Sequence, residues 1–558
     1  MYDKELRYFF SPATCKARSQ KYVLTLTYDG QGQHVQQLDA TDYDQVKVDA
    51  QNAFRNANTG RIDIDANWQI TPDGVEFKSS PIAKLFLLAT IKYATRDAYG
   101  MGVEYEGGKP GWNDAMNGLV GMVGSGMPET YELQQLLLYV KSVVDKYGRP
   151  VIVPEELGEL VDAISTEMNT LLSSGFTEPE ELSLDVPEVL FNYWNNVATA
   201  RETYRSKTGL SFTGVTKSIA AADVSNLITQ WLEQVEIGMA RAMKIGSDGF
   251  GNNGDSGVPP CYFSYDVTKW ELNGGHSTQG LPTINPLAMK VGSFPLFLEG
   301  PTRYLKTISD DRDASREIYN NVLVSGLRDK ELKNYFLSAS LEGQSYDMGR
   351  MMAFAPGWLE NQSIWLHMSY KYYLQLIRAG LYEEFFSEMQ GGGMLPYMNV
   401  DHYGRSLMQC SSFLASSAFP DPSQHGRGFE ARLSGSTAEF LDMWRLMFIG
   451  SKPFLMINGQ LSFQLIPAIP IWLFDSDADS KTDAEKTEPT TLNFKLFAEI
   501  DVIYHNSNWI NLYDVPPTRY LISFKDGTSK AIEGSIIGSD DAKSIRQVVT
   551  VASIDAYF

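Results

Sequence analysis

The chain has 558 residues, and its 68 Asp and Glu residues outnumber its 47 Lys and Arg residues, which gives a formal net charge of −21. This balance argues against nucleic acid and anionic membranes as main partners, because both require clustered positive charge. The apolar share of 43% provides for a sizeable core. The length predicts either roughly three to four domains or one large helical toroid with a satellite.

The cysteine and histidine content predicts neither a disulfide framework nor a metal site. Cys15, Cys261 and Cys410 are widely spaced, and the spacing of Cys410 from His402 and His425 is irregular. The N-terminus lacks the apolar run of a signal peptide, and no apolar stretch approaches the roughly 20 residues of a membrane span. We therefore expect a soluble, cytoplasmic protein without a metal or cofactor.

Amphipathic segments dominate the middle of the chain. Apolar residues recur with a helical period in several segments, and Ser436 and Thr437 are suitable caps for the last of them. The ranges predicted to be helical are 132–146, 154–172, 223–244, 367–389 and 436–450.

The pattern changes after about Lys452. Residues 494–503 alternate between apolar and polar, as a half-buried strand does, and 519–532 read as a hairpin that turns at Asp526-Gly527. The acidic run 475–491 is predicted to be a solvated loop. We therefore expect a helical body, 1–451, followed by a small β domain, 452–558.

A long Gly- and Asn-rich loop holds the first candidate for chemistry. In KPGWNDAMNGL, Asp114 is a lone acid that follows Trp112 and Asn113. A carboxylic acid beside an apolar wall keeps its proton near neutral pH, so this residue is a candidate general acid. Trp112 is suited to stacking on a sugar, and Asn113 to binding it. The alternative is that Asp114 only closes an Asx-turn in its own loop.

The second segment, PGWLENQSIWLHMSYKYYL, combines rings with hydrogen-bonding side chains directly before a predicted helix. Glu360, Asn361, Gln362 and Trp365 are suited to a hydroxyl-rich ligand. His367 falls at the helix start, where an anion is favoured. A lone histidine is more often structural, so both interpretations of His367 stay open.

The third segment, HGRGFEARLSGSTAEF, leads small residues into a predicted helix. The backbone N–H groups around Ser434 and Gly435 are suited to cradle an oxyanion such as phosphate, with charge added by Arg427 and Arg432. No GK[ST] ends the segment, so it is not a Walker loop. An ordinary helix cap is the alternative.

Together these segments resemble the inverting β-glucan phosphorylases of glycoside hydrolase family 94, most closely the 1,2-β-oligoglucan branch. Residues 109–133 resemble the general-acid loop of that branch. Residues 356–385 resemble its helix with the phosphate-binding histidine, and 411–444 resemble its phosphate loop. Gly111 replaces an acid that is common before this tryptophan in cellobiose phosphorylases, which favours the oligoglucan branch.

The resemblance implies an (α/α)6 barrel, incomplete or divergent at its N-terminus, with a C-terminal β jelly-roll-like domain. It implies Asp114 as general acid, and His367, Ser434 and Gly435 as phosphate ligands. The implied reaction is phosphorolysis of a β-gluco-oligosaccharide with inversion, giving α-glucose 1-phosphate. The implied partners are that oligosaccharide and inorganic phosphate, with a second copy of the chain in a homodimer.

One acid suffices for such a reaction, because phosphate is already an anionic nucleophile. An inverting hydrolase, the first alternative, also needs a base, for which Glu360 and Glu129 are candidates. The second alternative follows from the family's N-terminal β-sandwich and its glucose-gripping Arg/Asp segment, for which the sequence holds no match. The chain is therefore expected to correspond to a C-terminal half, which either acts alone or binds carbohydrate and depends on a partner.

Overall fold

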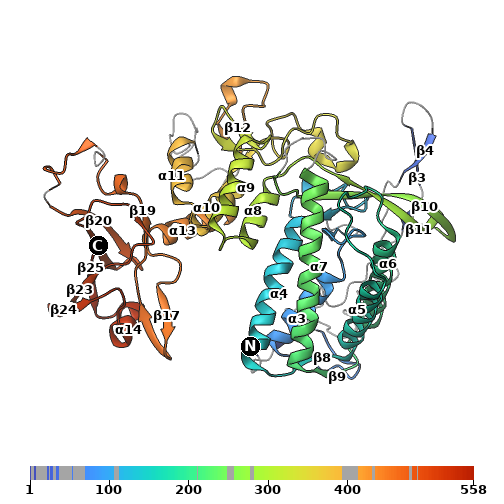
Figure 1. Cartoon of the computed structure of the whole chain (residues 1–558), viewed down its shortest axis with the longest axis horizontal. Helices are drawn as coiled ribbons and strands as arrows, with labels where there is room; N and C mark the ends of the chain where they lie inside the picture. Colours follow the sequence, from blue (N-terminus) through green and yellow to red (C-terminus); the bar gives the residue numbers. More distant parts are fainter. Residues whose placement is uncertain are drawn as a thin grey trace. The chain divides into compact units, whose positions relative to one another are not determined.

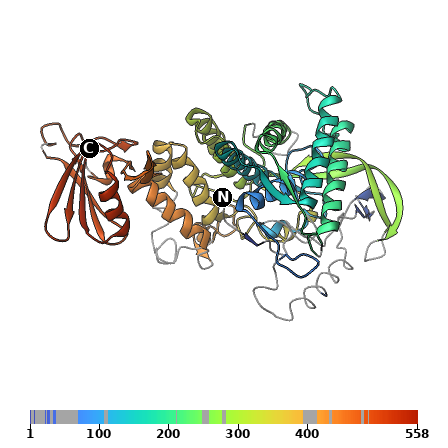
Figure 2. The same cartoon turned by 90° about the horizontal axis from the view of Figure 1, so that it is seen from below.

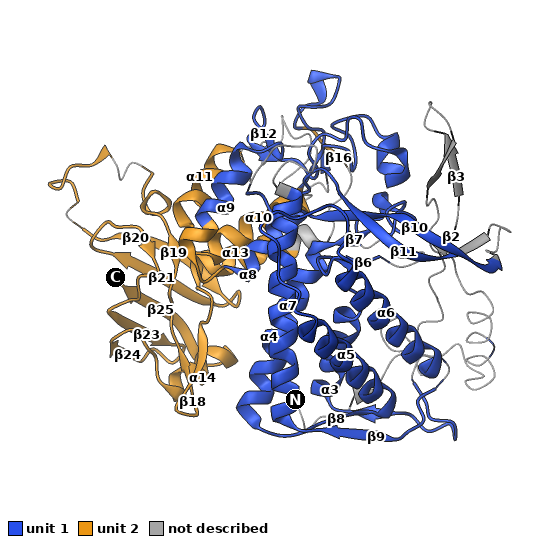
Figure 3. Cartoon of the chain, turned by 45° about the vertical axis from the view of Figure 1, so that its right-hand side comes forward, with its two compact units in different colours: residues 1–308, 316–365, 413–426 blue, residues 309–315, 366–412, 427–558 orange. Residues whose placement is uncertain are grey.

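The structure, a computed structural model, describes residues 69–105, 112–209, 211–247, 257–276, 282–392, 413–429, 434–476, 480–486 and 488–558, with short pieces of the first 68 residues. The chain divides into two compact units (Figure 3). Unit 1 comprises residues 1–308, 316–365 and 413–426, and unit 2 comprises 309–315, 366–412 and 427–558. Each unit is described by itself.

Unit 1 is built on long helices that run side by side (Figure 1). α4 packs against α3 and α7, and α5 packs against α6. The helices are α3 (Pro81–Tyr93), α4 (Met127–Tyr147), α5 (Glu155–Ser173), α6 (Glu188–Thr208) and α7 (Ala221–Ser247). The predictions for 132–146, 154–172 and 223–244 are confirmed, because each range lies within α4, α5 or α7 apart from Pro154, which caps α5.

The core of unit 1 forms where apolar helix faces meet. Trp231 on α7 is fully buried and stacks on two rings of α3, with centroid distances of 6.0 Å to Phe86 and 4.6 Å to Tyr93. Beside this core, Glu104 and Arg201 form a buried ion pair of 3.5 Å. Burial of aromatic area of this size is a main source of stability in a helical layer.

A five-stranded antiparallel sheet adjoins the helices, in the order β2-β11-β10-β7-β6. Its members are β2 (Tyr22–Val23), β6 (Val103–Glu104), β7 (Ser125–Gly126), β10 (Tyr262–His276) and β11 (Pro282–Ser293). The β10–β11 hairpin is its longest element, and the sequence patterns did not predict it. A smaller ladder, β8 (Val151–Pro154) with β9 (Thr216–Ile219), lies at the other end of the helices (Figure 1).

Short elements follow the hairpin and carry much of the candidate site. They are α8 (Glu299–Thr307), α9 (Arg312–Val324), β12 (Arg328–Asp329), β13 (Asn334–Tyr335), η3 (Tyr346–Met348), η4 (Arg350–Ala353), β14 (Ile364–Trp365) and β15 (Phe413–Leu414). β14 pairs antiparallel with β15, which brings together two segments far apart in the sequence.

The expectation of an (α/α)6 barrel is wrong for the described part of the chain. That fold requires alternating inner and outer helices around a ring. Here the helices of unit 1 are followed by the β10–β11 hairpin, and 327–365 form short strands and 3-10 turns instead of further helices. The architecture is mixed α and β. Helical periodicity identified α4, α5 and α7 correctly, but it did not predict α3 or α6 and carries no information about the strands between the helices.

Unit 2 begins with helices α10 (Leu366–Arg378), α11 (Tyr382–Gly391) and α13 (Ser434–Phe448). The single helix predicted for 367–389 is wrong, because the chain breaks between α10 and α11. Gly380 has φ +72°, a left-handed conformation that ends a helix and suits glycine. The prediction for 436–450 is confirmed, although α13 starts two residues earlier, at Ser434.

The C-terminal part of unit 2 is one five-stranded mixed sheet in the order β20-β21-β25-β23-β24, with α14 (Ser539–Gln547) packed against it (Figure 2). Its strands are β20 (Thr490–Leu496), β21 (Ile500–Asn506), β23 (Arg519–Phe524), β24 (Ser529–Glu533) and β25 (Val551–Tyr557). Two small ladders adjoin it, β17 (Phe454–Ile457) with β18 (Gln460–Phe463) and β19 (Ala468–Ile469) with β22 (Leu512–Tyr513).

This sheet corrects two expectations. A jelly roll stacks two antiparallel sheets, whereas the described strands give a single larger sheet that contains a parallel pair, β21 with β25. The single strand predicted for 494–503 is a hairpin that turns at Phe497 and Ala498, whose φ angles are +53° and +60°. The hairpin predicted for 519–532 is confirmed, with its turn at Gly527.

Across the described ranges, none of the helices combines the length and the apolar character that crossing a lipid bilayer requires.

Candidate functional site

The loop that carries Asp114 is fixed by close packing on the η3–η4 segment. The N–H of Gly118 donates to the carbonyl of Met348 at 3.2 Å. Gly349 has φ +125°, and a Cβ there would lie 2.7 Å from the carbonyl oxygen of Ala115. A side chain at 349 would therefore push the two segments apart, so glycine permits the contact.

Asp114 begins η2 (Asp114–Met116) and is paired with an arginine from the neighbouring segment. Its Oδ1 lies 2.7 Å from Nη2 of Arg350, and the two side chains are 63% and 51% exposed. The backbone N–H of Arg350 also donates to Oδ1 of Asn117, at 3.0 Å. The carboxylate of Asp114 thus contacts Arg350, and in the part of the loop that the structure describes, from residue 112 onward, it accepts no hydrogen bond from the loop backbone. This disfavours the Asx-turn interpretation, and the carboxylate is open to a ligand.

The loop of 355–365 is held tightly by its own polar groups. The amide of Asn361 donates to the carbonyl of Phe354 at 2.8 Å, and the indole N–H of Trp365 donates to the carbonyl of Leu359 at 2.7 Å. Leu359 and Gln362 have φ angles of +48° and +53°. Bulky residues with positive φ are strained and are found where the surroundings enforce one conformation. Asn361 and Trp365 therefore shape this loop.

Glu360 is held between these strained positions and lies near the Asp114–Arg350 pair. Its side chain is half-buried, and its Oε2 has no hydrogen-bond partner among the described residues. Burial raises the pKa of Glu360 above its usual value, and the charge of Asp114 acts in the same direction while Arg350 opposes it. Asp114 and Glu360, taken from two separate sequence segments, are thus both influenced by the charge of Arg350, and Asp114 forms an ion pair with it.

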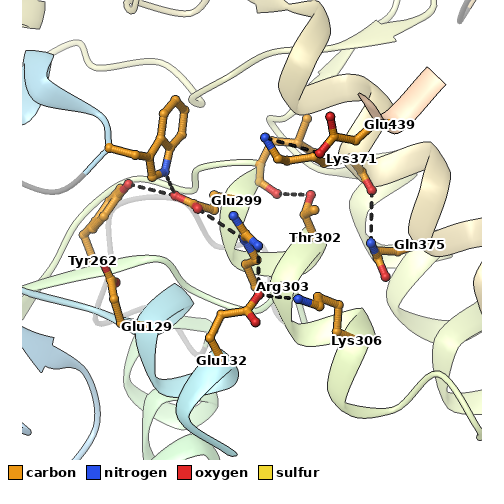
Figure 4. Close-up of polar contacts among 12 residues, drawn as sticks. Glu129, Glu132, Tyr262, Glu299, Thr302, Arg303, Lys306, Lys371, Gln375 and Glu439 are labelled. Atoms are coloured by element: carbon orange, nitrogen blue, oxygen red, sulfur yellow. Dashed lines mark hydrogen bonds and ion pairs between the residues drawn. The ribbon is translucent and has the colours of Figure 1, made fainter. Parts of the chain in front are cut away.

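Trp112 connects the acid loop to a buried carboxylate on α8. Its indole N–H donates to Oε2 of Glu299, while its side chain remains 43% exposed. Glu299 is 2% exposed and also accepts from the hydroxyl of Tyr262 at 3.4 Å and from Nε of Arg303 at 3.3 Å (Figure 4). Asn113, in contrast, is buried at 4% exposure, so its side chain lies beneath the loop.

Glu129, in the first turn of α4, is electrostatically coupled to Glu299. Burial raises the pKa of Glu129 to about 7, and the charge of Glu299 is the second cause. The hydroxyl of Tyr105 donates to its Oε2 at 3.2 Å. Two like charges in a poorly hydrated place disfavour each other. Unit 1 therefore holds, in the first turn of α4, a half-buried carboxyl group whose pKa of about 7 lies close to neutral pH.

In unit 2, α10 and α13 pack side by side in the same direction. Nζ of Lys371 lies 3.6 Å from Oε1 of Glu439, and, further along both helices, Nη2 of Arg378 lies 2.5 Å from Oδ2 of Asp442. Because the two ion pairs follow the same order on both helices, the helices start at the same end. Parallel helix starts concentrate free N–H groups and positive dipole ends, which favours an anion.

His367 lies in the first turn of α10 and is 7% exposed. Burial lowers its pKa to about 4, with the nearby charge of Lys371 as the second cause. The imidazole is therefore neutral at pH 7 and acts as a hydrogen-bonding group rather than a charge. Ser434 and Gly435 form the first turn of α13, the other start in this pair.

The remaining predicted residues are placed as follows. Arg427 is exposed, directly before β16 (Gly428–Phe429). His425 bonds Glu331 and the carbonyl of Phe419, at 2.9 and 2.8 Å. Arg432, His402 and Cys410, and the side chains of 434–437, lie outside the described residues.

Sequence reasoning missed two residues of this site, Arg350 and Glu299. Arg350 is an isolated arginine in a methionine-rich stretch, and its pairing with Asp114 depends on a contact that no local pattern encodes. Glu299 has the signature of an ordinary acid in the first turn of a helix, where the dipole favours it. In the sequence, the only hint of the contact that brings Arg350 to Asp114 was the presence of Gly118 and Gly349, because glycine permits two backbone segments to approach closely.

Comparisons with known proteins add no family assignment: no protein-family model matches the chain, and no curated protein matches its sequence. The residues above and the resemblance of the three sequence segments are the basis for a function.

Proposed function

We propose that the chain is a glycoside phosphorylase that cleaves β-glucosidic bonds of gluco-oligosaccharides, with 1,2-linked chains as the first substrates to test. The observation that carries the proposal is the accessible carboxylate of Asp114 in unit 1, which Arg350 holds at 2.7 Å and which lies in the same loop as the exposed Trp112. Asp114 lies in a segment that, together with the segments of His367 and Ser434, resembles parts of one enzyme family. An accessible carboxylate next to half-buried polar groups and an exposed tryptophan suits a sugar ligand.

In the proposed reaction, Asp114 is the general acid. Its carboxylate, which is paired with Arg350 in the free chain, first takes up a proton from solvent and gives it to the glycosidic oxygen as the bond from that oxygen to the anomeric carbon breaks. A phosphate oxygen attacks the anomeric carbon from the opposite face, which inverts the configuration and yields α-glucose 1-phosphate. Asp114 is left as the carboxylate with which the cycle began. No base is required, because phosphate arrives as an anion, whereas water has to be deprotonated.

The phosphate end of the proposal rests on unit 2. The starts of α10 and α13 lie at the same end of the helix pair, and His367 occupies the first of them. A neutral, buried imidazole donates a hydrogen bond to phosphate, and the N–H groups at Ser434 and Gly435 offer further donors. Arg427 is the additional charge in this part of the proposal.

An inverting hydrolase is the second candidate, and Glu360 is the observation that favours it. A half-buried carboxyl group near the general acid is the second group that a hydrolase needs in order to activate water. Glu129, the other sequence candidate, is electrostatically coupled to the more buried Glu299.

One assay separates these functions. The purified chain is incubated with a 1,2-β-gluco-oligosaccharide with and without inorganic phosphate, and both glucose 1-phosphate and reducing ends are measured. Phosphorolysis predicts glucose 1-phosphate that depends on phosphate and disappears in Asp114→Asn. Phosphate-independent sugar release, lost in Glu360→Gln, identifies the hydrolase. Binding of the oligosaccharide with no turnover under either condition, restored by a partner chain, identifies a partner-dependent half.

A further inference from the structure

Unit 2 contains a cavity that the proposed reaction does not use. Its volume is about 450 Å³, which is within the range of small-ligand sites. It lies where the C-terminal ends of α10 and α13 come together, because both Ile377 and Leu446 line it. It is therefore at the opposite end of the helix pair from His367 and the start of α13.

The lining of the cavity combines apolar side chains with polar ones, which are together called the polar rim. Ile377, Leu446, Ile449 and Ile466 supply aliphatic surface. The rim includes Arg312, whose guanidinium packs over Gly380, a residue with φ +72° and no side chain to obstruct it. A lining that offers both apolar and hydrogen-bonding side chains suits a ring with C–H faces and polar edges.

Most charges around the rim are already neutralised within the protein. Nη2 of Arg312 lies 3.4 Å from Oδ2 of Asp514, and the hydroxyl of Tyr382 donates to Oδ1 of the same carboxylate at 2.6 Å. Arg378 is paired with Asp442, as described above. These pairs leave the cavity with little net charge of its own.

Two charged residues of the lining remain available for a ligand. Among the described residues, neither the carboxylate of Asp310 nor the ammonium of Lys452 has an ion-pair or hydrogen-bond partner. The carboxylate of Asp310 accepts hydrogen bonds, and the ammonium of Lys452 donates them. Gln464 adds an amide, whose Nε2 is 3.3 Å from the carbonyl of Lys452.

Because charged groups of both signs line the cavity, a strongly charged ligand of either sign is disfavoured. A phosphate-like anion would meet Asp310, Asp514 and the negative C-terminal ends of two helices. A cation would meet Arg312, Arg378 and Lys452. A neutral polyol avoids both conflicts, because each hydroxyl donates one hydrogen bond and accepts others.

We infer that this cavity binds a neutral pyranose unit of an oligosaccharide, at a site separate from Asp114. The pyranose ring contacts the aliphatic side chains of the lining, and its hydroxyl groups bond to Asp310, Lys452 and Gln464. The site holds carbohydrate without any catalytic step. The inference does not depend on the proposed phosphorylase activity, because it follows from the lining of this cavity alone.

The test uses the full chain in the Asp114→Asn background, so that turnover does not complicate binding. Isoleucine methyl NMR is recorded during titration with a 1,2-β-gluco-oligosaccharide. Resonances of Ile377, Ile449 and Ile466 are expected to shift. Replacing Asp310 and Lys452 together by alanine is expected to weaken the affinity read from these methyl groups by roughly tenfold or more, because hydrogen bonds to charged groups are lost.

A matched control removes one acid and one lysine elsewhere in unit 2. Asp540 and Lys543 are an exposed pair at 3.8 Å on α14, so Asp540→Ala with Lys543→Ala leaves the net charge equally unchanged. The control is expected to retain the affinity. Should the cavity variant lose its native NMR spectrum, the single substitution Gln464→Ala takes its place, with a severalfold loss expected.

Three outcomes would overturn the inference: no shift of the cavity methyl groups, equal affinity in the cavity variant and the control, or displacement of the sugar from these methyl groups by inorganic phosphate alone. The result is independent of the activity assay. Glucose 1-phosphate formation without binding here would leave the proposed function intact, whereas binding here without turnover would leave only the cavity inference.

Discussion

Nη2 of Arg350 lies 2.7 Å from Oδ1 of Asp114, and this contact joins segments 236 residues apart. Both side chains are about half or more exposed, so the pair is expected to add no more than about 1 kcal/mol to stability. Its main consequence is positional, because Glu360 also senses both charges. If Arg350 positions Asp114 for the reaction, its replacement should lower activity and leave stability nearly unchanged. If the contact has no role in the reaction, its replacement should leave activity unchanged as well.

Arg350→Gln is expected to reduce glucose 1-phosphate formation by roughly tenfold or more, since a misplaced acid loses orientation. The midpoint of thermal unfolding should change little. Arg519→Gln is the matched control, because Arg519 is a similarly exposed arginine paired with Glu533 at 3.5 Å in the C-terminal sheet. Equal activity in both variants would show that the Asp114–Arg350 contact is incidental.

Glu129→Gln is expected to stabilise the protein at alkaline pH. The pKa of Glu129 is about 7 in the folded chain and near 4.5 when exposed, so the folded state binds more protons between these values. Wild-type stability should therefore fall as the pH rises from 4.5 through 7, by up to roughly 3 kcal/mol from this group. Glu129→Gln has no carboxyl group to ionise at this position, so its stability should not fall for this reason. Urea unfolding of both proteins at pH 5 and pH 8 measures the difference in their free energies of unfolding.

Glu132, one turn further along α4, provides a control of opposite sign. Although burial opposes it, the hydrogen bonds and charges of Lys306 and Arg303 lower the pKa of Glu132. Its contribution is therefore present above the unfolded pKa and is lost as the pH falls through the folded one. Glu132→Gln should destabilise the protein at pH 8. If both variants respond to pH in the same direction, the assignment of charge states around Arg303 is wrong.

His367 is expected to report phosphate directly. Its pKa of about 4 in the free protein should rise by a unit or more when phosphate binds, because an adjacent anion favours the protonated ring. A histidine NMR titration with and without phosphate measures this shift. In kinetics, His367→Ala should raise KM for phosphate about tenfold or more and leave KM for the oligosaccharide nearly unchanged.

His505 offers the comparison for that experiment. Its Nε2 bonds Asp555 at 2.8 Å within the C-terminal sheet, so His505→Gln should affect neither KM. If the pKa of His367 is the same with and without phosphate, phosphate does not bind at the start of α10.

The sequence predicted those elements whose stability comes from a local repeat. α4, α5 and α7 each present an apolar stripe over several turns, and Asp526-Gly527 specifies its own hairpin. The β10–β11 hairpin was missed because its far half, with KWELNGGH, has the polar, glycine-rich composition of a loop. Pairing with β11 makes it a strand, and pairing is a tertiary contact.

The residues of the candidate site likewise separate into those that a local sequence pattern indicates and those that only tertiary contacts reveal. Asp114 and Glu360 were identifiable because each is a lone acid beside a tryptophan in an irregular segment. Arg350 and Glu299 gain their meaning only from the partners that the fold brings to them, Asp114 in one case and Trp112 in the other. Composition indicated which residues were candidates for chemistry, whereas their spatial neighbours could not be predicted from it.

The break between α10 and α11 leads to the last prediction. Gly380→Ala should lower the free energy of unfolding by more than Gly459→Ala, although both glycines have positive φ angles, +72° and +78°. Alanine in that conformation costs roughly 1–2 kcal/mol at either position. At 459 a Cβ meets nothing within 4 Å, but at 380 it would collide with the guanidinium of Arg312. That side chain would have to leave Asp514, so the excess loss in Gly380→Ala measures how firmly the Arg312–Asp514 pair is held at the cavity rim. Equal losses in urea unfolding would mean that Arg312 moves aside without cost and that the rim is pliable.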